Sequence, residues 1–301
     1  MSLSTRSTTI LFVLLGGAMT LSSCSGTAGP ADATASTPAS REVSADLAAI
    51  EEEHGVTIGV SAHTADATAN IEYRADDRFG YASTVKTFVA SALLSALSPA
   101  ERSATVTWTQ AEIDAAGYSP VTSAHVADGL TLDELAEAAV RESDYTATNL
   151  VMQSLGGPEA VQAHLRLLGD DSTVVSQREP DLNTVVPGQD VNTTTPAAFA
   201  SALREAFEGD VLSAAGQDTL MDWMSGNATG DALIRAGAPP GWIVADKSGG
   251  AGGIRNDLAV ATPPDGEPVY LAILTTTDDP DADYDDVVIE ETARVVLAAL
   301  G

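Results

Sequence analysis

Ser83 and Lys86 have the side-chain types and the spacing for nucleophilic catalysis. They lie three residues apart, and on a helix side chains with this spacing share one face, one turn apart. The amine would then neighbour the hydroxyl, and free backbone N–H groups near the helix N-terminus could stabilise an oxyanion. Taken alone, the pattern is more typical of a helix cap followed by a surface lysine.

Lysine is scarce in this chain, so each of its positions is informative. The 14 basic residues are twelve arginines and two lysines, Lys86 and Lys247. A lysine suggests a place that needs a compact point charge or a group able to lose its proton. Lys247 opens Lys-Ser-Gly-Gly at 247–250, and between the two lysines lie Ser-Asp-Tyr at 143–145 and Arg-Glu-Pro-Asp-Leu-Asn at 178–183.

The order and spacing of these four motifs resemble the class A serine β-lactamases, which carry Ser-x-x-Lys, Ser-Asp-Asn and Lys-Thr/Ser-Gly. The resemblance covers nearly everything from about residue 45 to the end, including Tyr-Ser-Pro-Val-Thr at 118–122. It implies a serine hydrolase that opens the cyclic amide of a small-molecule β-lactam through an acyl-enzyme. It implies no cofactor.

The resemblance also implies a role for each matched residue. Ser83 would attack the lactam carbonyl, and the backbone N–H groups of Ser83 and Gly250 would hold the oxyanion. Ser143 would pass a proton to the departing nitrogen. Lys247, on a predicted edge strand at 242–248, would offer positive charge to the substrate carboxylate. Arg255, on the turn after that strand, would add a second cation.

Glu179 and Asn183 would orient the water that hydrolyses the acyl-enzyme, inside a long segment without clear periodicity at 170–194. For acylation, either Lys86 or Glu179 acting through water is a possible base. If Lys86 were the base, its pKa would have to fall far below the ordinary lysine value of about 10.4, while the nearby Glu179 carboxylate would raise it. The sequence analysis therefore favours Glu179.

Three further positions would shape the substrate site. Tyr118 would form an aromatic wall at its entrance, although half-buried packing is a fair alternative, and Ser248 would line it. Tyr145 replaces the asparagine that the family uses to contact Lys86 and the substrate amide, so this contact is in doubt. Gln177 and Asn192 replace the family's Arg-Asp pair at the neck of the loop; they could still hydrogen-bond, which predicts a formed but less rigid loop.

Periodicity and capping signals predict an α/β (α+β) fold of the β-lactamase/transpeptidase-like kind, with an antiparallel five-stranded sheet flanked by helices and an inserted all-helical region. The predicted strands are 57–64, 70–76, 242–248, 256–262 and 268–276. The predicted helices are 46–54, 82–97, one starting at the Thr131 capping box, 146–155, 158–168, 196–207, 217–225 and 285–300. The sheet domain would comprise 43–77 and 226–301, and the helical domain 78–225.

The N-terminal segment has the features of an export signal. One charge, a short apolar run and small residues precede Leu-Ser-Ser-Cys, which predicts a signal peptide at 1–23. This motif resembles the bacterial lipobox, so Cys24, the only cysteine, would carry a lipid, unless ordinary cleavage leaves a free thiol. Residues 24–42 would form a flexible tether. The protein would then be an exported lipoprotein on the extracytoplasmic side of the bacterial cell membrane.

The charge balance excludes nucleic acid as a partner, since Asp and Glu outnumber Lys and Arg 43 to 14. The four histidines lack metal-ligand spacing, so no metal site is expected. The acidic run at 278–286 has a tyrosine where an EF-hand loop needs glycine, which favours a solvated turn.

We expect the protein to be a monomer. Two other functions remain open. The nearest is a penicillin-binding D-Ala-D-Ala peptidase or esterase, which would have no need of Glu179 and Asn183. The other is a non-catalytic lipoprotein that binds a β-lactam or a cell-wall fragment, which only Tyr145 encourages.

Overall fold

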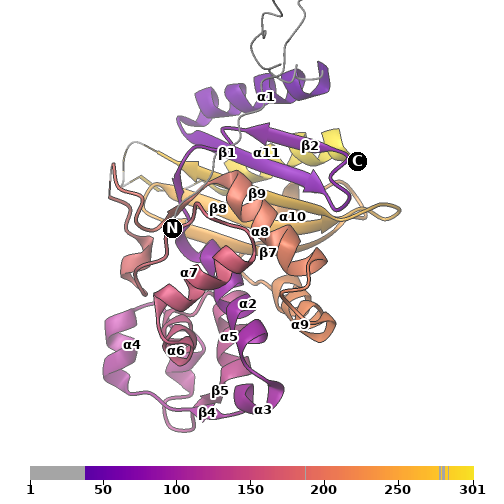
Figure 1. Cartoon of the computed structure of the whole chain (residues 1–301). Helices are drawn as coiled ribbons and strands as arrows, with labels where there is room; N and C mark the ends of the chain where they lie inside the picture. Colours follow the sequence, from indigo (N-terminus) through magenta and orange to yellow (C-terminus); the bar gives the residue numbers. More distant parts are fainter. Residues whose placement is uncertain (1–37, 187, 278, 280–281, 284) are drawn as a thin grey trace, which may run out of the picture. The chain divides into compact units, whose positions relative to one another are not determined.

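A five-stranded antiparallel sheet with the order β2-β1-β9-β8-β7 organises the fold (Figure 1). The computed structural model describes residues 38–186, 188–277, 279, 282–283 and 285–301. The sheet strands are β1 (Thr57–Thr64), β2 (Asn70–Tyr73), β7 (Ile243–Ala251), β8 (Ile254–Thr262) and β9 (Val269–Thr276). The predicted five-stranded antiparallel sheet is confirmed.

The sheet is assembled from both ends of the described chain. Val60 of β1 pairs with Tyr73 on one side and with Ile273 of β9 on the other. Strands β7 and β9 are buried along most of their length. Near-continuous apolar sequences such as Val-Tyr-Leu-Ala-Ile-Leu fit strands that are covered on both faces. Helices must therefore lie on each side of the sheet.

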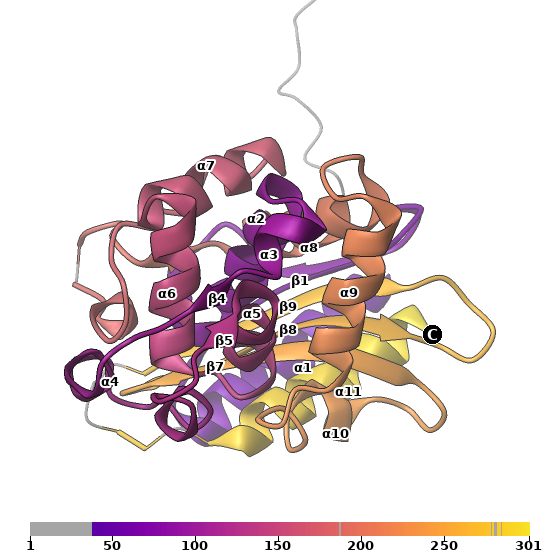
Figure 2. The same ribbon diagram turned by 90° about the horizontal axis from the view of Figure 1, so that it is seen from below.

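One face of the sheet is covered by α1 (Pro38–His54), α10 (Ile234–Gly237) and α11 (Asp286–Leu300) (Figures 1 and 2). Leu47 of α1 and Leu297 of α11 pack with Ile58 and Leu271 of the strands in one buried apolar cluster. Apolar residues three and four apart along α11 supply its buried face.

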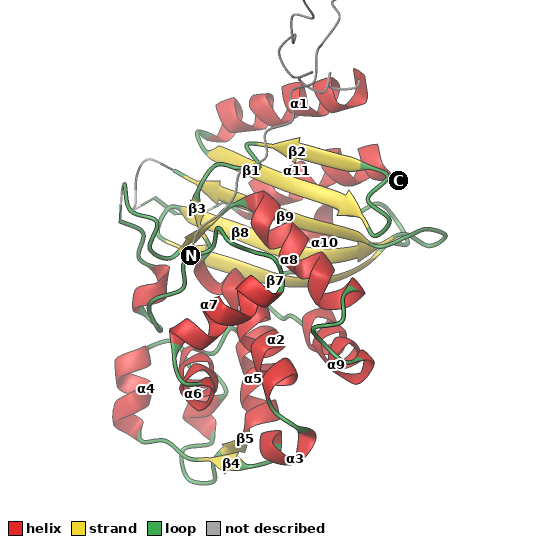
Figure 3. Cartoon of the chain, in the orientation of Figure 1, coloured by secondary structure: helices red, strands yellow, loops and turns green. Residues whose placement is uncertain are grey.

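The other face carries α8 and the inserted helical region, as the colouring by secondary structure shows (Figure 3). The helices are α2 (Lys86–Ala96), α3 (Pro99–Arg102), α4 (Gln110–Ala116), α5 (Leu132–Arg141), α6 (Tyr145–Leu155), α7 (Pro158–Leu167), α8 (Pro196–Glu208) and α9 (Ala214–Ser225). Short 3₁₀ turns are η1 (Ala82–Val85), η2 (Thr122–Ala124) and η3 (Asp181–Asn183). Two small ladders pair β3 (Phe79–Gly80) with β6 (Thr193–Thr194) and β4 (Thr105–Val106) with β5 (Leu130–Thr131).

Helix α2 lies at the centre of the helical region, and residues 86–94 of it are all buried. Its Ala-, Leu- and Ser-rich sequence is apolar on every side, as expected of an interior helix. The aromatic rings of Phe88 and Phe199 pack at 4.9 Å between centroids and join α2 to α8. Helix α2 is therefore held by the neighbouring helices and, through α8, on the side that faces the sheet.

The predicted elements agree with the structure except at some ends. Thr131 caps α5 in a complete capping box, as predicted. Strand β2 stops at Tyr73 because Arg74 adopts a φ of +45°, which a strand cannot continue. Residues 82–85 form a 3₁₀ turn rather than the first turn of an α-helix, a frequent start for a helix.

The predicted division into a sheet domain and a helical domain stays a prediction. The signal peptide, Cys24 and most of the predicted tether lie outside the described residues, although α1 already begins at Pro38. The acidic run at 278–286 is described only in part. Among the described helices, none combines the length and the apolar character needed to cross a bilayer.

His164 on α7 makes the stability of the fold depend on pH. Its side chain is 5 % exposed and its Nε2 lies 2.8 Å from Ser91 Oγ. Burial lowers the pKa of His164 to about 4, so between about pH 6.5 and 4 the unfolded chain takes up a proton that the folded chain excludes. The free energy of unfolding is expected to rise by about 3 kcal/mol between pH 4 and 6.5 from this residue alone.

Urea denaturation of the wild type and of His164→Asn across this pH range tests the expectation. The asparagine can keep a hydrogen bond to Ser91 but does not titrate, so the variant should lose this part of the pH dependence. Parallel stability curves for the two proteins would contradict the assignment.

Candidate active site

A cavity of about 390 Å³ lies between the edge strand β7 and the helical region. It is lined by Ser83, Tyr118, Ser143, Tyr145, Thr229, Ser248, Gly249, Gly250 and Arg255. Segments that are far apart in the sequence, from η1, the start of α6 and β7, thus meet in one place. Seven of these nine residues are site residues predicted from the sequence.

Ser83 is held at the junction of η1 with strand β7. In a 3₁₀ turn residues i and i+3 eclipse each other, so Ser83 and Lys86 share a face although the turn is not α-helical. A Cβ on Gly249 would lie 3.1 Å from Thr84 N and from Tyr81 O; glycine therefore allows β7 to approach η1 closely. The neighbouring Gly250 also lines the cavity.

The Ser143 hydroxyl lies between the two lysines. Lys86 Nζ donates to Ser143 O at 2.7 Å and to Ser143 Oγ at 3.2 Å, and Lys247 Nζ reaches Ser143 Oγ at 3.3 Å. Ser143 adopts a φ of +57°, a backbone conformation that is costly outside glycine and is typical of functional sites. With both ammonium groups donating to it, the Ser143 hydroxyl can direct its own proton toward a bound substrate.

Glu179 and Lys86 form a buried ion pair. Lys86 Nζ lies 2.7 Å from Glu179 Oε1, and both side chains are 0 % exposed. Asn183 Nδ2 donates to Glu179 Oε2 at 2.5 Å. The Glu179 backbone exchanges two hydrogen bonds of 2.9 Å with the side chain of Asn149 on α6. The long loop is therefore fixed to α6 at the residue whose carboxylate enters the site.

Burial changes the expected pKa of Lys86. Burial lowers the pKa of Lys86 below the ordinary lysine value, and the Glu179 carboxylate raises it only in part. The sequence indicates the neighbouring carboxylate but not the cost of removing the Lys86 amine from water. Loss of the Lys86 proton is thus easier than the sequence alone indicated.

Lys247 is also fully buried, and this lowers its pKa to about 7; the nearby positive charge of Lys86 adds to the effect, whereas Asp246 and Asp257 oppose it. Its charge is therefore lost as the pH rises through about 7. If Lys247 attracts an anionic substrate, kcat/KM should fall above pH 7 with a midpoint near this pH, because kcat/KM reports the free enzyme.

The variant Lys247→Arg gives the matched control for this pH prediction, since arginine stays charged. Its kcat/KM should be lower at neutral pH but should lack the alkaline fall near pH 7. The same midpoint in both enzymes would assign that fall to another group.

Of three further cavity residues, only Arg255 lies on a different element from the one expected, whereas Tyr118 and Ser248 line the cavity. Arg255 lies on β8 rather than on the preceding turn, and its Nε contacts Asp286 Oδ1 at 2.7 Å, which offsets part of its charge. Tyr118 is 53 % exposed at the cavity, which suits an entrance wall better than packing. Ser248 Oγ lies 2.6 Å from Thr229 Oγ1.

The neck of the loop is closed by neutral side chains, as the sequence allowed. Asn192 Nδ2 donates to Gln177 Oε1 at 2.5 Å and also to the carbonyls of Asp181 and Thr184 at 3.0 Å. The hydrogen bond expected between Gln177 and Asn192 is present. The lower rigidity expected of the loop stays a prediction.

Sequence reasoning missed several residues that position the site. Asp144 accepts from Val121 N and Thr122 N at 2.9 Å and also caps α6, which fixes the segment after Tyr118. Asn256 Nδ2 donates to Gly80 O at 2.7 Å, which ties β8 to the chain leading into η1. Asn149 and Asn256 have no local signal; Asp144 stands inside a recognised motif and could have been found.

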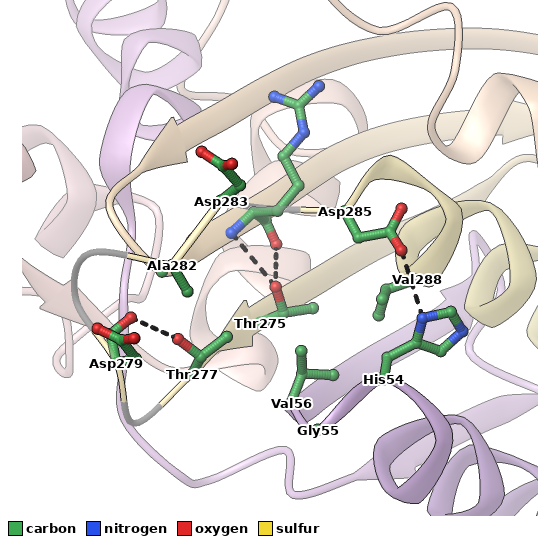
Figure 4. A pocket seen from close by; sticks show the side chains of 12 residues that line it. His54, Gly55, Val56, Thr275, Thr277, Asp279, Ala282, Asp283, Asp285 and Val288 are labelled. Atoms are coloured by element: carbon green, nitrogen blue, oxygen red, sulfur yellow. Dashed lines mark hydrogen bonds and ion pairs between the residues drawn. The ribbon is translucent and has the colours of Figure 1, made fainter.

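A second cavity of about 310 Å³ opens near the start of α11 (Figure 4). His54 and Asp285 face each other there at 3.4 Å. Of the predicted site residues only Arg255 lines it, and Ser83 and the two lysines are not among its lining residues. Within the described residues no group of three His, Cys, Asp or Glu side chains could hold a metal ion.

A fold of this kind, with a serine, two lysines and a loop glutamate around one cavity, defines an acyl-transfer enzyme of the penicillin-recognising type. Residues 42–300 match the model of the β-lactamase enzyme family. The chain belongs to this family, and its similarity to class A members confirms the resemblance seen in the sequence.

Its relatives support this assignment over most of the chain. It is 41 % identical to a β-lactamase of Bacillus licheniformis, over 96 % of this chain and 94 % of the relative. It is 42 % identical to β-lactamase FAR-1 of Nocardia farcinica, with 85 % and 82 % covered. The crystal structure of a class A β-lactamase from Clostridium kluyveri has a TM-score of 0.83 and 38 % identity, covering 86 % of this chain and 99 % of that one.

Proposed function

We propose that this protein hydrolyses β-lactams through an acyl-enzyme on Ser83. The Ser83 hydroxyl attacks the lactam carbonyl, and the backbone N–H groups of Ser83 and Gly250 stabilise the oxyanion. Ser143 Oγ gives its proton to the departing nitrogen. Lys247 attracts the substrate carboxylate, with Arg255 as the second cation, and Tyr118 lines the entrance of the cavity.

The observation that carries this proposal is the placement of the Glu179 carboxylate. It lies 2.7 Å from the Lys86 amine and accepts from Asn183, beside the segment that carries Ser83. Asn183 Oδ1 is buried and has no hydrogen-bond partner within the described residues. A water placed between the Glu179 carboxylate and the Asn183 amide oxygen would be oriented for attack on the acyl-enzyme.

Glu179, acting through this water, is also the base we propose for acylation. The contact with Lys86 favours the pair as an ammonium and a carboxylate, and a carboxylate can accept the proton of Ser83 by way of water. The competing route is direct transfer of the Ser83 proton to the Lys86 amine. It stays open because the pKa of Lys86 is lowered.

A chromogenic cephalosporin assay on the purified domain tests the proposal, with Ser83→Ala as the control. Many turnovers per enzyme that vanish in Ser83→Ala support a hydrolase. One equivalent of label without turnover would instead indicate a binding lipoprotein, and preferential cleavage of D-Ala-D-Ala peptides would indicate a peptidase.

We further propose that the enzyme is exported and anchored to the cell membrane by a lipid on Cys24, and that it acts there as a monomer. The support is sequence alone: a short apolar run, Leu-Ser-Ser-Cys, and a polar Pro-containing segment after it. Labelled palmitate should enter the wild type but not Cys24→Ser, and the variant should leave the membrane fraction. Equal membrane association of the two proteins would contradict lipid anchoring.

A further inference from the structure

Tyr145, the first residue of α6, covers the amine of Lys86. Lys86 Nζ lies 4.3 Å from the centroid of the Tyr145 ring, over its face. At this distance an ammonium is attracted by the negative face of an aromatic ring, most strongly where water is excluded, and Lys86 is fully buried. Tyr145, which replaces an asparagine of the family, therefore contacts the Lys86 amine.

The Tyr145 ring contacts Lys86 in addition to its oxygen ligands. Lys86 Nζ is near Ser143 O, Ser143 Oγ and Glu179 Oε1, and three oxygens satisfy the three N–H groups of an ammonium. A π face offers no fourth hydrogen bond that would turn the amine away from these partners.

The charged groups near Lys86 come from the long loop, from the N-terminus of α6 and from β7. Glu179 from the loop and Asp144 from the N-terminus of α6 raise the pKa of Lys86, whereas burial lowers it. Lys247 from β7 and Lys86 repel each other. Asp144 acts on Lys86 through its charge. By contrast, Glu179, the two Ser143 oxygens and the Tyr145 ring contact the amine directly.

Two neighbours hold the Tyr145 ring in this orientation. Asn183 Nδ2 approaches the Tyr145 hydroxyl at 3.4 Å, and the ring of Tyr118 meets the Tyr145 ring edge to face, with centroids 5.8 Å apart at 72°. The ring face is thus held on Lys86, and the hydroxyl points to Asn183. Ring and hydroxyl can therefore be separated by substitution.

We propose that Tyr145 is a positioning residue for the acyl-transfer reaction: its ring face holds Lys86 as an ammonium directed at Ser143 and Glu179. The inference rests on the proposed function. It adds to the proposed machinery Tyr145, whose aromatic ring stands where the family has the amide of an asparagine. The ring, rather than the phenol hydroxyl, carries the effect.

The test uses the fact that Lys86 and Lys247 are the only lysines in the chain. In protein labelled with ¹³C at lysine Cε, NMR gives two resonances, and Lys247→Arg assigns them. Their titration is followed in the wild type, Tyr145→Phe and Tyr145→Leu. We expect the pKa of Lys86 to be retained in the Phe variant and lowered in the Leu variant, because leucine keeps the site dry but removes the π face.

The same two variants are compared by kinetics on one cephalosporin. We expect kcat of Tyr145→Leu to be about tenfold below that of Tyr145→Phe, with a smaller difference in KM. A structural role alone would leave the Lys86 titration the same in both variants, and that result, or a higher pKa in Tyr145→Leu, overturns the inference. Because NMR needs no turnover, failure of wild-type hydrolysis would count against the proposed function and leave this comparison intact.

Discussion

Glu179→Gln is expected to acylate on Ser83 far more slowly than the wild type and then to stall as the acyl-enzyme, because Glu179 is the proposed base of both steps; kcat should fall about a thousandfold. A glutamine amide preserves the shape of the side chain and one acceptor oxygen, but it cannot take a proton from the attacking water. Mass spectrometry of the variant mixed with a penicillin should show the protein carrying the mass of one substrate. A quench-flow burst of one equivalent should precede the slow phase.

The exposed Asp181 on the same loop gives a matched control, since Asp181→Asn removes one negative charge two residues away. This variant should turn over close to the wild-type rate. If Glu179→Gln hydrolyses as fast as Asp181→Asn, Glu179 has no role in deacylation. If it acylates as fast as Asp181→Asn and fails only in deacylation, Glu179 is not the acylation base, and the competing route through the Lys86 amine holds for the first step.

Lys86→Met is expected to lower the free energy of unfolding by about 3–5 kcal/mol as well as to abolish turnover. The methionine fills a similar volume, but it leaves the Glu179 carboxylate fully buried without its cation. An unpaired buried charge is costly because neither water nor a counter-ion stabilises it. Urea denaturation at pH 7 measures the loss.

The double variant Lys86→Met with Glu179→Gln isolates the pair. Removing both charges should recover most of the stability lost in Lys86→Met, which gives a large coupling energy in the double-mutant cycle. The surface pair of Arg294 and Glu290 is the comparison, with side chains 55 % and 31 % exposed; Arg294→Met should cost far less. Additive losses for Lys86 and Glu179 would contradict a coupled buried pair.

Much of the fold could be predicted from the sequence because its main elements are long and strongly patterned. The capping box at Thr131 and the apolar run of β9 each determine an element locally. The helices α3 and α10 have four residues each, too few for periodicity to show. The two-residue ladder between Phe79 and Thr194 depends on packing that no short segment encodes.

The motif residues were predictable, but their surroundings were not. Asn149 and Glu179 are separated by 30 residues, and no local pattern links an amide on one helix to a distant loop. The contact of Arg255 with Asp286 joins residues 31 apart in the sequence, and no local pattern indicates it either. For Tyr145 the sequence showed the loss of an amide, whereas only coordinates could show the gain of a ring face on Lys86.

The pairing of β1 with β9 sets a condition on biosynthesis. Ile58 and Thr275 are neighbours in the sheet yet lie near opposite ends of the described chain, so β1 can pair with β2 early but lacks its second neighbour until β9 has been made. Contacts of such long range form slowly, because a large loop must close first. The sheet of this protein therefore stays incomplete until β9 has been made, and a C-terminal truncation that removes β9 leaves one edge of β1 unpaired.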